Sequence, residues 1–106
     1  MDGARCLLEN SVHRDKKLLK LARDQSCVSC GAHDGTVVWA HANGAEWGKG
    51  LGLKAHDCMG MFLCSICHHQ LDQGFLWTRE EKRELTYKWI CKTHIKLWEE
   101  GLVKVA

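Results

Sequence analysis

Two pairs of cysteines carry the clearest chemical pattern in this sequence. Cys27 and Cys30 form one Cys-x-x-Cys motif, and Cys64 and Cys67 form a second. Zn²⁺ takes thiolates readily and prefers four ligands in a tetrahedron, which two such motifs supply. A redox motif of the thioredoxin type is the alternative, but that motif occurs as a single pair. We therefore predict one closed structural zinc site that ties together the two ends of a hairpin.

A histidine and an aspartate follow the second cysteine pair. His68 comes directly after Cys67, and Asp72 lies four residues later, so a helix here places both side chains on one face. An imidazole and a carboxylate suit a divalent ion such as Mg²⁺ that keeps open positions for water and phosphate oxygens. The alternative is that His68 packs beside the cysteines while Asp72 is solvated. His69 points about 100° away on the same helix and is predicted to lie on the surface.

His41 is the third candidate for chemistry. It ends a β-branched and aromatic stretch at residues 36–41, which predicts a strand. The zinc site closes the hairpin that contains this strand, so the strand should lie opposite the helix that carries His68 and Asp72. A histidine placed there can take a proton from water as a general base.

The stretches "CVSCG", "VVWAHAN" and "LCSICHHQLD" together resemble the HNH endonuclease superfamily, the ββα-metal nucleases. In that superfamily a histidine ends the first strand as general base, and the helix carries ligands of a catalytic metal. The resemblance implies that His41 is the base and that His68 and Asp72 hold the ion. About residues 15–105 also resemble small prophage-encoded nuclease-like proteins, in "LLKLARDQSC", "GKGLGLKAHD" and "GLVKV" as well.

Two positions differ from the superfamily pattern. Ala40 stands where many members have a metal-binding residue before the base histidine, so another residue must supply a ligand. Asp57 is the candidate, and His56 is a weaker one. A residue must also orient the base histidine, and Asp57 or Asn43 is expected to take this role. Asp57 could alternatively be a loop-capping aspartate.

Residues 42–57 contain four glycines and predict a long loop with a functional role. Its Gly-Lys-Gly stretch lacks the spacing and the hydroxyl of a nucleotide-binding P-loop. We expect Lys49 and Lys54 to contact DNA phosphates. Trp47 either stacks on a base or packs over the foot of the loop.

The remaining pattern predicts the elements that position these residues. An amphipathic helix is expected at 12–24, strands at 36–41 and 58–64, and a helix from Cys64 to about residue 73. Thr78 and Glu81 form a capping box that should start a long helix, which Gly101 ends. The apolar stripe of this helix is expected to comprise Tyr87, Cys91, Ile95 and Trp98, widened by Trp89, Ile90 and Leu97. A short strand is expected in "LVKV".

We expect a single α+β domain over residues 1–106, with a zinc-stabilised ββα-metal (HNH) core flanked by N- and C-terminal helices. Residues 1–25 form the N-terminal helical region, 26–75 the zinc-braced core, and 76–106 the C-terminal helix and short strand. There is no run of 18 apolar residues to span a membrane and no signal-peptide core, so a cytoplasmic protein is expected. The resemblance implies that it is encoded by a phage or prophage. The unpaired Cys6, Cys58 and Cys91 are predicted to be buried small apolar residues.

The predicted function is metal-dependent DNA endonuclease, with Zn²⁺ as structural and Mg²⁺ or another divalent ion as catalytic cofactor. The net charge is only +2, and no recognition helix is evident. Cleavage directed by DNA structure, such as branched DNA, is therefore favoured over sequence reading. The alternatives are a non-catalytic zinc-finger-like nucleic-acid-binding module and a structural interaction protein. By analogy with resolvases, the C-terminal helix offers a surface for a homodimer, and the sequence leaves the oligomeric state open.

Overall fold

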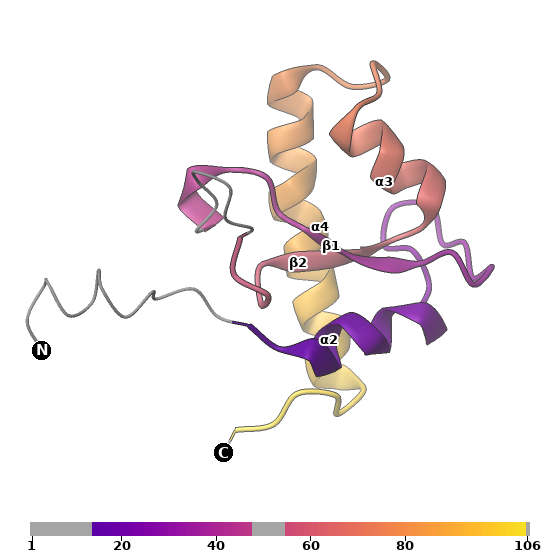
Figure 1. The fold of residues 1–106 in the computed structure, drawn as a ribbon, viewed down its shortest axis with the longest axis vertical. Helices are drawn as coiled ribbons and strands as arrows, with labels where there is room; N and C mark the ends of the chain where they lie inside the picture. The colour runs from indigo at the N-terminus through magenta and orange to yellow at the C-terminus, as the bar shows by residue number, and fades with distance from the viewer. Residues whose placement is uncertain (1–13, 48–54, 106) are drawn as a thin grey trace, which may run out of the picture.

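Two short antiparallel strands lie at the centre of the fold in the computed structural model, which describes residues 14–47 and 55–105. The elements in chain order are helix α2 (Lys16–Leu21), 3₁₀ turn η1 (Ala22–Asp24), strand β1 (Val38–His41), 3₁₀ turn η2 (Ala45–Trp47), strand β2 (Gly60–Leu63), helix α3 (Ser65–Asp72) and helix α4 (Arg79–Glu99). Figure 1 shows their arrangement. This composition confirms the predicted α+β class, with strands and helices slightly shorter than expected.

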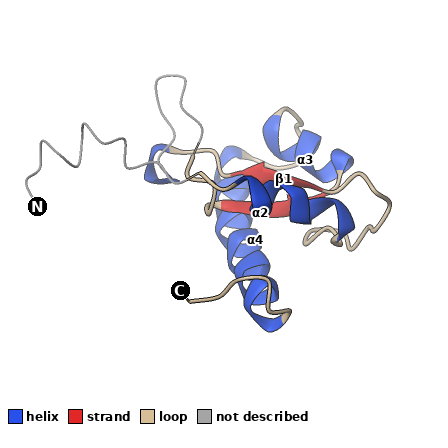
Figure 2. Ribbon diagram, turned by 60° about the horizontal axis from the view of Figure 1, so that its bottom comes forward, coloured by secondary structure: helices blue, strands red, loops and turns tan. Residues whose placement is uncertain are grey.

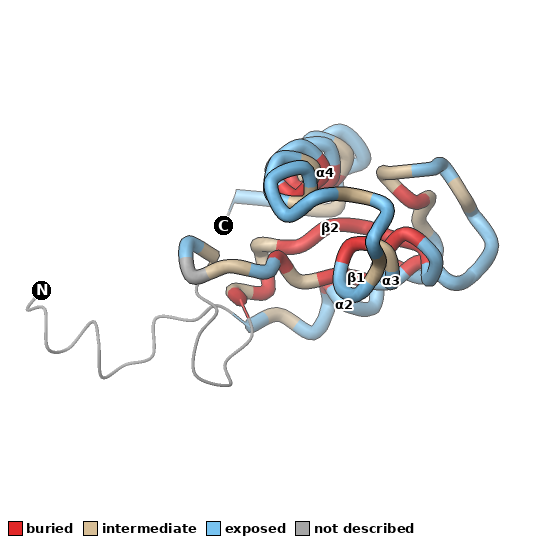
Figure 3. Tube along the Cα trace, turned by 90° about the horizontal axis from the view of Figure 1, so that it is seen from above, coloured by how far each residue is buried: buried red, intermediate tan, exposed pale blue. Residues whose placement is uncertain are grey.

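Helices cover both faces of the two-stranded sheet. Helix α4 packs on β2 and α2 packs on β1, with the sheet between them (Figures 2 and 3). Helix α3 continues directly from β2 and packs back against it. Because helices cover both faces, all four residues of β2 are buried. The sheet needs this cover, since a two-stranded ribbon alone is marginally stable in water. The buried apolar residues from these elements form one cluster that includes Leu18, Trp39, Ala40, Met61, Phe62, Leu63, Leu71, Trp89, Ile90 and Leu97.

The strand register places a glycine opposite the candidate base. Trp39 pairs with Phe62, and His41 pairs with Gly60. The Trp39 ring meets Phe62 edge to face, with centroids 5.3 Å apart. Its indole also lies over Gly60, because a Cβ added to that glycine would come within 2.3 Å of Trp39 Nε1. The missing side chain at Gly60 therefore lets Trp39 reach across the strand end.

The outer edge of β2 is satisfied by groups from other elements. Phe62 N–H donates to Thr93 Oγ1 at 3.3 Å, and Val28 N–H donates to the carbonyl of Phe62 at 2.9 Å. A buried backbone group without a partner is costly, so these two contacts fix α4 and the first cysteine motif to the sheet. They explain why Thr93, a polar residue, is fully buried in the middle of α4.

Helix α4 begins and ends as the sequence predicts. Thr78 Oγ1 accepts a hydrogen bond from Glu81 N–H at 3.1 Å, and Glu81 Oε1 accepts one from Thr78 N–H at 2.8 Å. These reciprocal bonds are the predicted capping box. After the last turn Gly101 adopts φ +68°, the left-handed conformation that ends many helices.

The predicted apolar stripe of α4 is wrong. Tyr87, Cys91, Ile95 and Trp98 are all exposed. The buried face consists of the residues expected only to widen the stripe, Trp89, Ile90 and Leu97, together with Thr86 and Thr93. This face packs on β2, where Thr93 also accepts a hydrogen bond from Phe62 N–H, and the other stripe is left exposed.

Two smaller expectations are also wrong. Residues 102–105, which include "LVKV", form no strand. Cys91 is exposed and Cys58 is only partly buried, so neither is a core cysteine, while Cys6 lies outside the described residues. The expected loop between the strands contains the 3₁₀ turn η2, and part of it lies outside the described residues.

The close approach of Trp39 to Gly60 generates a prediction about stability. Gly60→Ala should lower the free energy of unfolding by about 1–3 kcal/mol, the usual cost of overpacking a rigid core. The new Cβ would meet the buried indole and also the carbonyl of Ala40 at 2.9 Å. Chemical denaturation measures the change. Gly44→Ala is the matched control, because its Cβ would meet chiefly the flexible carboxylate end of Glu46. Equal stability of the two variants would contradict the prediction.

Candidate functional site

The four cysteines of the two motifs lie together in space. The sulfurs of Cys27, Cys30, Cys64 and Cys67 all lie within 4.8 Å of one another. A tetrahedral zinc ion with Zn–S bonds of about 2.3 Å separates its sulfurs by about 3.8 Å. The Sγ atoms of Cys30 and Cys64 are 3.6 Å apart, which matches that spacing. The cluster could therefore hold a metal ion such as zinc.

Local backbone geometry brings the sulfurs together. Gly31 N–H donates to the carbonyl of Cys27 at 2.8 Å, and Gly31 has φ +81°, which closes a tight turn around the first motif. In the second motif Cys64 is the N-cap of α3, and its sulfur accepts from Cys67 N–H at 3.5 Å. The first motif thus comes from a turn and the second from a helix start.

The ionisation of these thiols is strongly shaped by their surroundings. Burial, together with the neighbouring thiols of Cys64 and Cys30, raises the pKa of Cys67 to about 12. Burial also opposes ionisation of Cys27, but hydrogen bonds from the backbone of Cys64, Cys30 and Ser29 lower its pKa to about 7. Several thiolates this close together repel one another unless a cation compensates them. The donor set thus suits a bound divalent cation.

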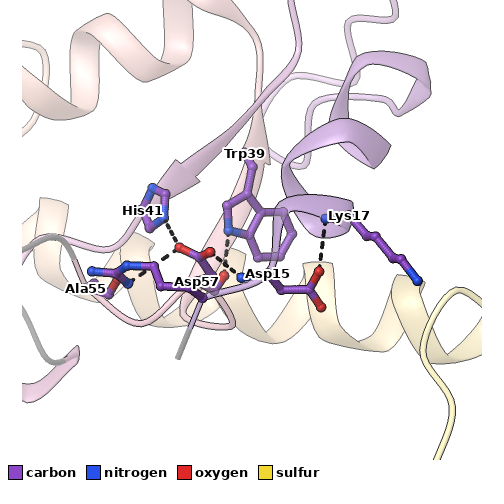
Figure 4. A network of polar contacts seen from close by, with 7 residues as sticks. Asp15, Lys17, Trp39, His41, Ala55 and Asp57 are labelled. Atoms are coloured by element: carbon purple, nitrogen blue, oxygen red, sulfur yellow. Dashed lines mark hydrogen bonds and ion pairs between the residues drawn. The ribbon is translucent and has the colours of Figure 1, made fainter. Parts of the chain in front are cut away.

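His41 is held by a buried carboxylate. Its Nε2 lies 2.8 Å from Asp57 Oδ1, and the Asp57 side chain is only 3 % exposed (Figure 4). Burial raises the pKa of Asp57, but hydrogen bonds from His41 and from Asp15 N–H outweigh it and hold the pKa below its usual value. Because the carboxylate is therefore charged, it accepts and His41 Nε2–H donates. In the neutral ring this leaves Nδ1 as the basic nitrogen.

Asp57 is also bound by the residues that precede α2. Asp15 N–H donates to Asp57 Oδ2, and Arg14 Nη1 lies 3.5 Å from Asp57 Oδ1. The same Arg14 nitrogen donates to the carbonyl of Ala55 at 2.7 Å. The Trp39 indole N–H donates to the carbonyl of Asp57 at 2.7 Å (Figure 4). Sequence reasoning missed Arg14, because no spacing relates it to a residue 43 positions away.

His68 and Asp72 form the second polar pair. They lie one turn apart on α3, with His68 Nε2 3.1 Å from Asp72 Oδ2. Together with Trp39, His41, Asn43 and Ala55, they line a hollow of about 400 Å³. The structure therefore brings the candidate base and the helix pair to the walls of one hollow. Within the described residues, the four cysteines are the only cluster of three or more potential metal ligands. A second ion bound by His68 and Asp72 would therefore have two ligands from the protein.

The other predicted site residues lie at the margins or outside the described chain. Asn43 is exposed on the rim of this hollow and also lines two neighbouring ones. His56 does not line the hollow. Trp47 packs against Tyr87, with ring centroids 4.8 Å apart. Lys49 and Lys54 lie outside the described residues.

Comparison with known proteins identifies no family for this chain. No family model matches it, and no curated protein or solved structure does so either. Nor does any helix in the described part combine the length and apolar character that crossing a bilayer requires. The function must therefore be argued from the site itself.

The cysteine cluster predicts that the purified protein carries about one Zn²⁺ per chain. Cys64→Ser should lose most of this metal, and its melting temperature should fall by about 10 °C or more, the shift expected for a loss of about 2 kcal/mol in a domain of this size. Elemental analysis and calorimetry measure the two effects. Cys91→Ser is the control, because Cys91 is exposed and outside the cluster. Stoichiometric zinc in Cys64→Ser would contradict the assignment.

Proposed function

We propose that this protein is a metal-dependent DNA endonuclease of the ββα-metal type, with His41 as general base. The observation that carries the proposal is the shared hollow of about 400 Å³, which His41 lines on the strand side and His68 and Asp72 line on the helix side. At roughly 30 Å³ per water molecule, this volume can accommodate a hydrated ion and one phosphate group. The sequence resemblance to the HNH superfamily points to the same residues.

In the proposed reaction His41 takes the proton from the attacking water. The ionised Asp57 receives Nε2–H, so Nδ1 is the nitrogen that accepts the proton. The negative charge of Asp57 then stabilises the imidazolium, as a buried acid does in other base–acid pairs. Asp57 thus serves as the residue that orients the base, a role for which Asp57 and Asn43 were the two candidates.

His68 and Asp72 would hold the catalytic divalent ion. Their nitrogen and oxygen donors stand 3.1 Å apart, and both side chains are more than a third exposed toward solvent. Two mixed donors with open access suit Mg²⁺ or a similar ion that keeps most positions for water and substrate oxygens. When bound, such an ion supplies Lewis-acid stabilisation of the charge that develops on the phosphate and the leaving oxygen.

The cysteine cluster has a structural role in this proposal. A zinc ion bound by four thiolates has no open position, so it can brace the fold but cannot bind a substrate. It would fix the turn at Cys27 and Cys30 to the start of α3. The zinc site would thus fix the position of the strand that ends at His41 relative to the helix that carries His68.

The substrate in this proposal is DNA, and its path leads away from the hollow along α4. Two neighbouring hollows share Asn43 with the first, and Arg79 and Lys82 line both of them. Arg83 lines one of these and is partly neutralised by Glu46 at 3.6 Å. Cations along such a path contact phosphates without reading bases, which favours cleavage directed by DNA structure.

The proposal predicts divalent-dependent cleavage that depends on two histidines. His41→Ala should lower kcat about 10²- to 10⁴-fold, the usual contribution of a general base, while zinc content and DNA affinity persist. His68→Ala should raise the Mg²⁺ or Mn²⁺ concentration required for cleavage. Cleavage of linear, nicked, flapped and four-way DNA measures both effects.

His69→Ala is the matched control on the same helix, because His69 is exposed and lines none of the three hollows described. The endonuclease proposal fails if wild-type protein cleaves no DNA form with Mg²⁺, Mn²⁺ or Ni²⁺. Salt-dependent DNA binding without cleavage would then favour the zinc-finger-like binding module. An absence of DNA binding would favour an interaction protein.

A further inference from the structure

The contacts between the start of α2 and Asp57 join two distant parts of the chain. Arg14 and Asp15 lie 43 and 42 positions before Asp57. Their three contacts reach one short stretch: the carbonyl of Ala55 and the two carboxylate oxygens of Asp57. Figure 4 shows that this stretch lies directly beside the His41 ring.

These contacts determine how the Asp57 carboxylate is turned. Its Oδ2 receives Asp15 N–H, and its Oδ1 faces both Arg14 and His41. The Trp39 indole holds the Asp57 backbone through the carbonyl oxygen. With the backbone and one oxygen held, the other oxygen can only point toward His41.

The partners on the α2 side are themselves anchored. Asp15 caps α2, with its own carboxylate accepting from Lys17 N–H at 2.9 Å, so its backbone N–H is fixed in place. Arg14 reaches the Ala55 carbonyl and the Asp57 carboxylate with the same guanidinium nitrogen, Nη1, which carries two N–H donors. Its side chain is 42 % exposed, and after a substitution there the buried Asp57 carboxylate still receives hydrogen bonds from Asp15 N–H and His41.

We propose that Arg14 is a positioning residue for the general base. This inference rests on the proposed function. Arg14 binds the Ala55 carbonyl and the Asp57 carboxylate together, which turns Oδ1 toward His41 and keeps the imidazole in the tautomer with Nε2 protonated and Nδ1 basic. Arg14 need not touch the DNA to do this.

A merely structural role for Arg14 makes a different prediction. If Arg14 only fastened residues 14–15 to the rest of the fold, its loss would lower stability and leave the His41 ring unchanged. If Arg14 bound a DNA phosphate, its loss would raise KM and leave kcat unchanged. The tautomer of His41 and the division between kcat and KM separate these roles from positioning.

The experiment compares wild type, Arg14→Ala and Arg14→Lys as zinc-loaded full-length proteins. The ¹⁵N chemical shifts of the His41 ring, recorded at a pH where the ring is neutral, report the tautomer. Wild type should be predominantly protonated at Nε2, and Arg14→Ala should show a mixture. Asp57→Ala is the reference for complete loss of the acceptor. Arg23→Ala is the matched control, an exposed arginine just after α2 with no contact to Asp57.

In the cleavage assay Arg14→Ala should lower kcat roughly 10- to 100-fold, the range for groups that orient a histidine from behind, with little change in KM. Arg14→Lys should recover part of this loss, because an ammonium group can hold one of the two acceptors. An Arg14→Ala spectrum identical to that of wild type overturns the inference, as does a change in KM alone. Wild-type protein that never cleaves DNA refutes the endonuclease, while the tautomer comparison still decides the role of Arg14.

Discussion

The burial of the Asp57 carboxylate constrains the region around the candidate site more than any other single group. A charged carboxylate that is only 3 % exposed needs hydrogen-bond donors from the protein. It receives them from His41, from Asp15 N–H and from Arg14, and its own carbonyl accepts from Trp39. One side chain therefore joins the residues before α2, strand β1 and the segment before β2. The position of His41 follows from the same need.

The cysteine cluster supplies the second constraint, at the start of the helix that lines the hollow. Because Cys64 both belongs to the cluster and caps α3, the start of that helix is fixed relative to the first cysteine motif. Val28 N–H, within that motif, also binds the carbonyl of Phe62 in β2. The strand and the helix thus share their anchors, and His68 and Asp72 face the end of β1 as a consequence. Neither constraint alone defines the hollow, since Asp57 places one wall and the cysteines place the other.

Local patterns in the sequence were sufficient for the parts of the fold that depend on neighbouring residues. The spacing of the cysteines, the capping box at Thr78 and the glycine at Gly101 each act within a few residues, and each was predicted. The buried face of α4 was not, because that helix has two apolar stripes of similar strength. The face that packs on β2 includes Thr86 and Thr93, and only a tertiary contact, such as the bond from Phe62 N–H to Thr93, places a threonine in a buried face. Arg14 was missed for the same reason, since its contacts depend entirely on tertiary structure.

The two aspartates of the site differ in a way that favours different roles. Asp57 is buried, and both of its oxygens face protein donors, which makes it a poorer ligand for a hydrated ion than an exposed carboxylate. Asp72 is 43 % exposed, and within the part of the chain that the structure describes its ion-pair partner is His68. Environment separates two carboxylates into distinct functions in many hydrolytic sites. In the proposed endonuclease, an Asp57 that orients the base would not also replace the ligand that Ala40 lacks, and the open positions of the ion would be left to water and to the substrate phosphate. A site with so few protein ligands would bind its ion weakly alone and more tightly with DNA.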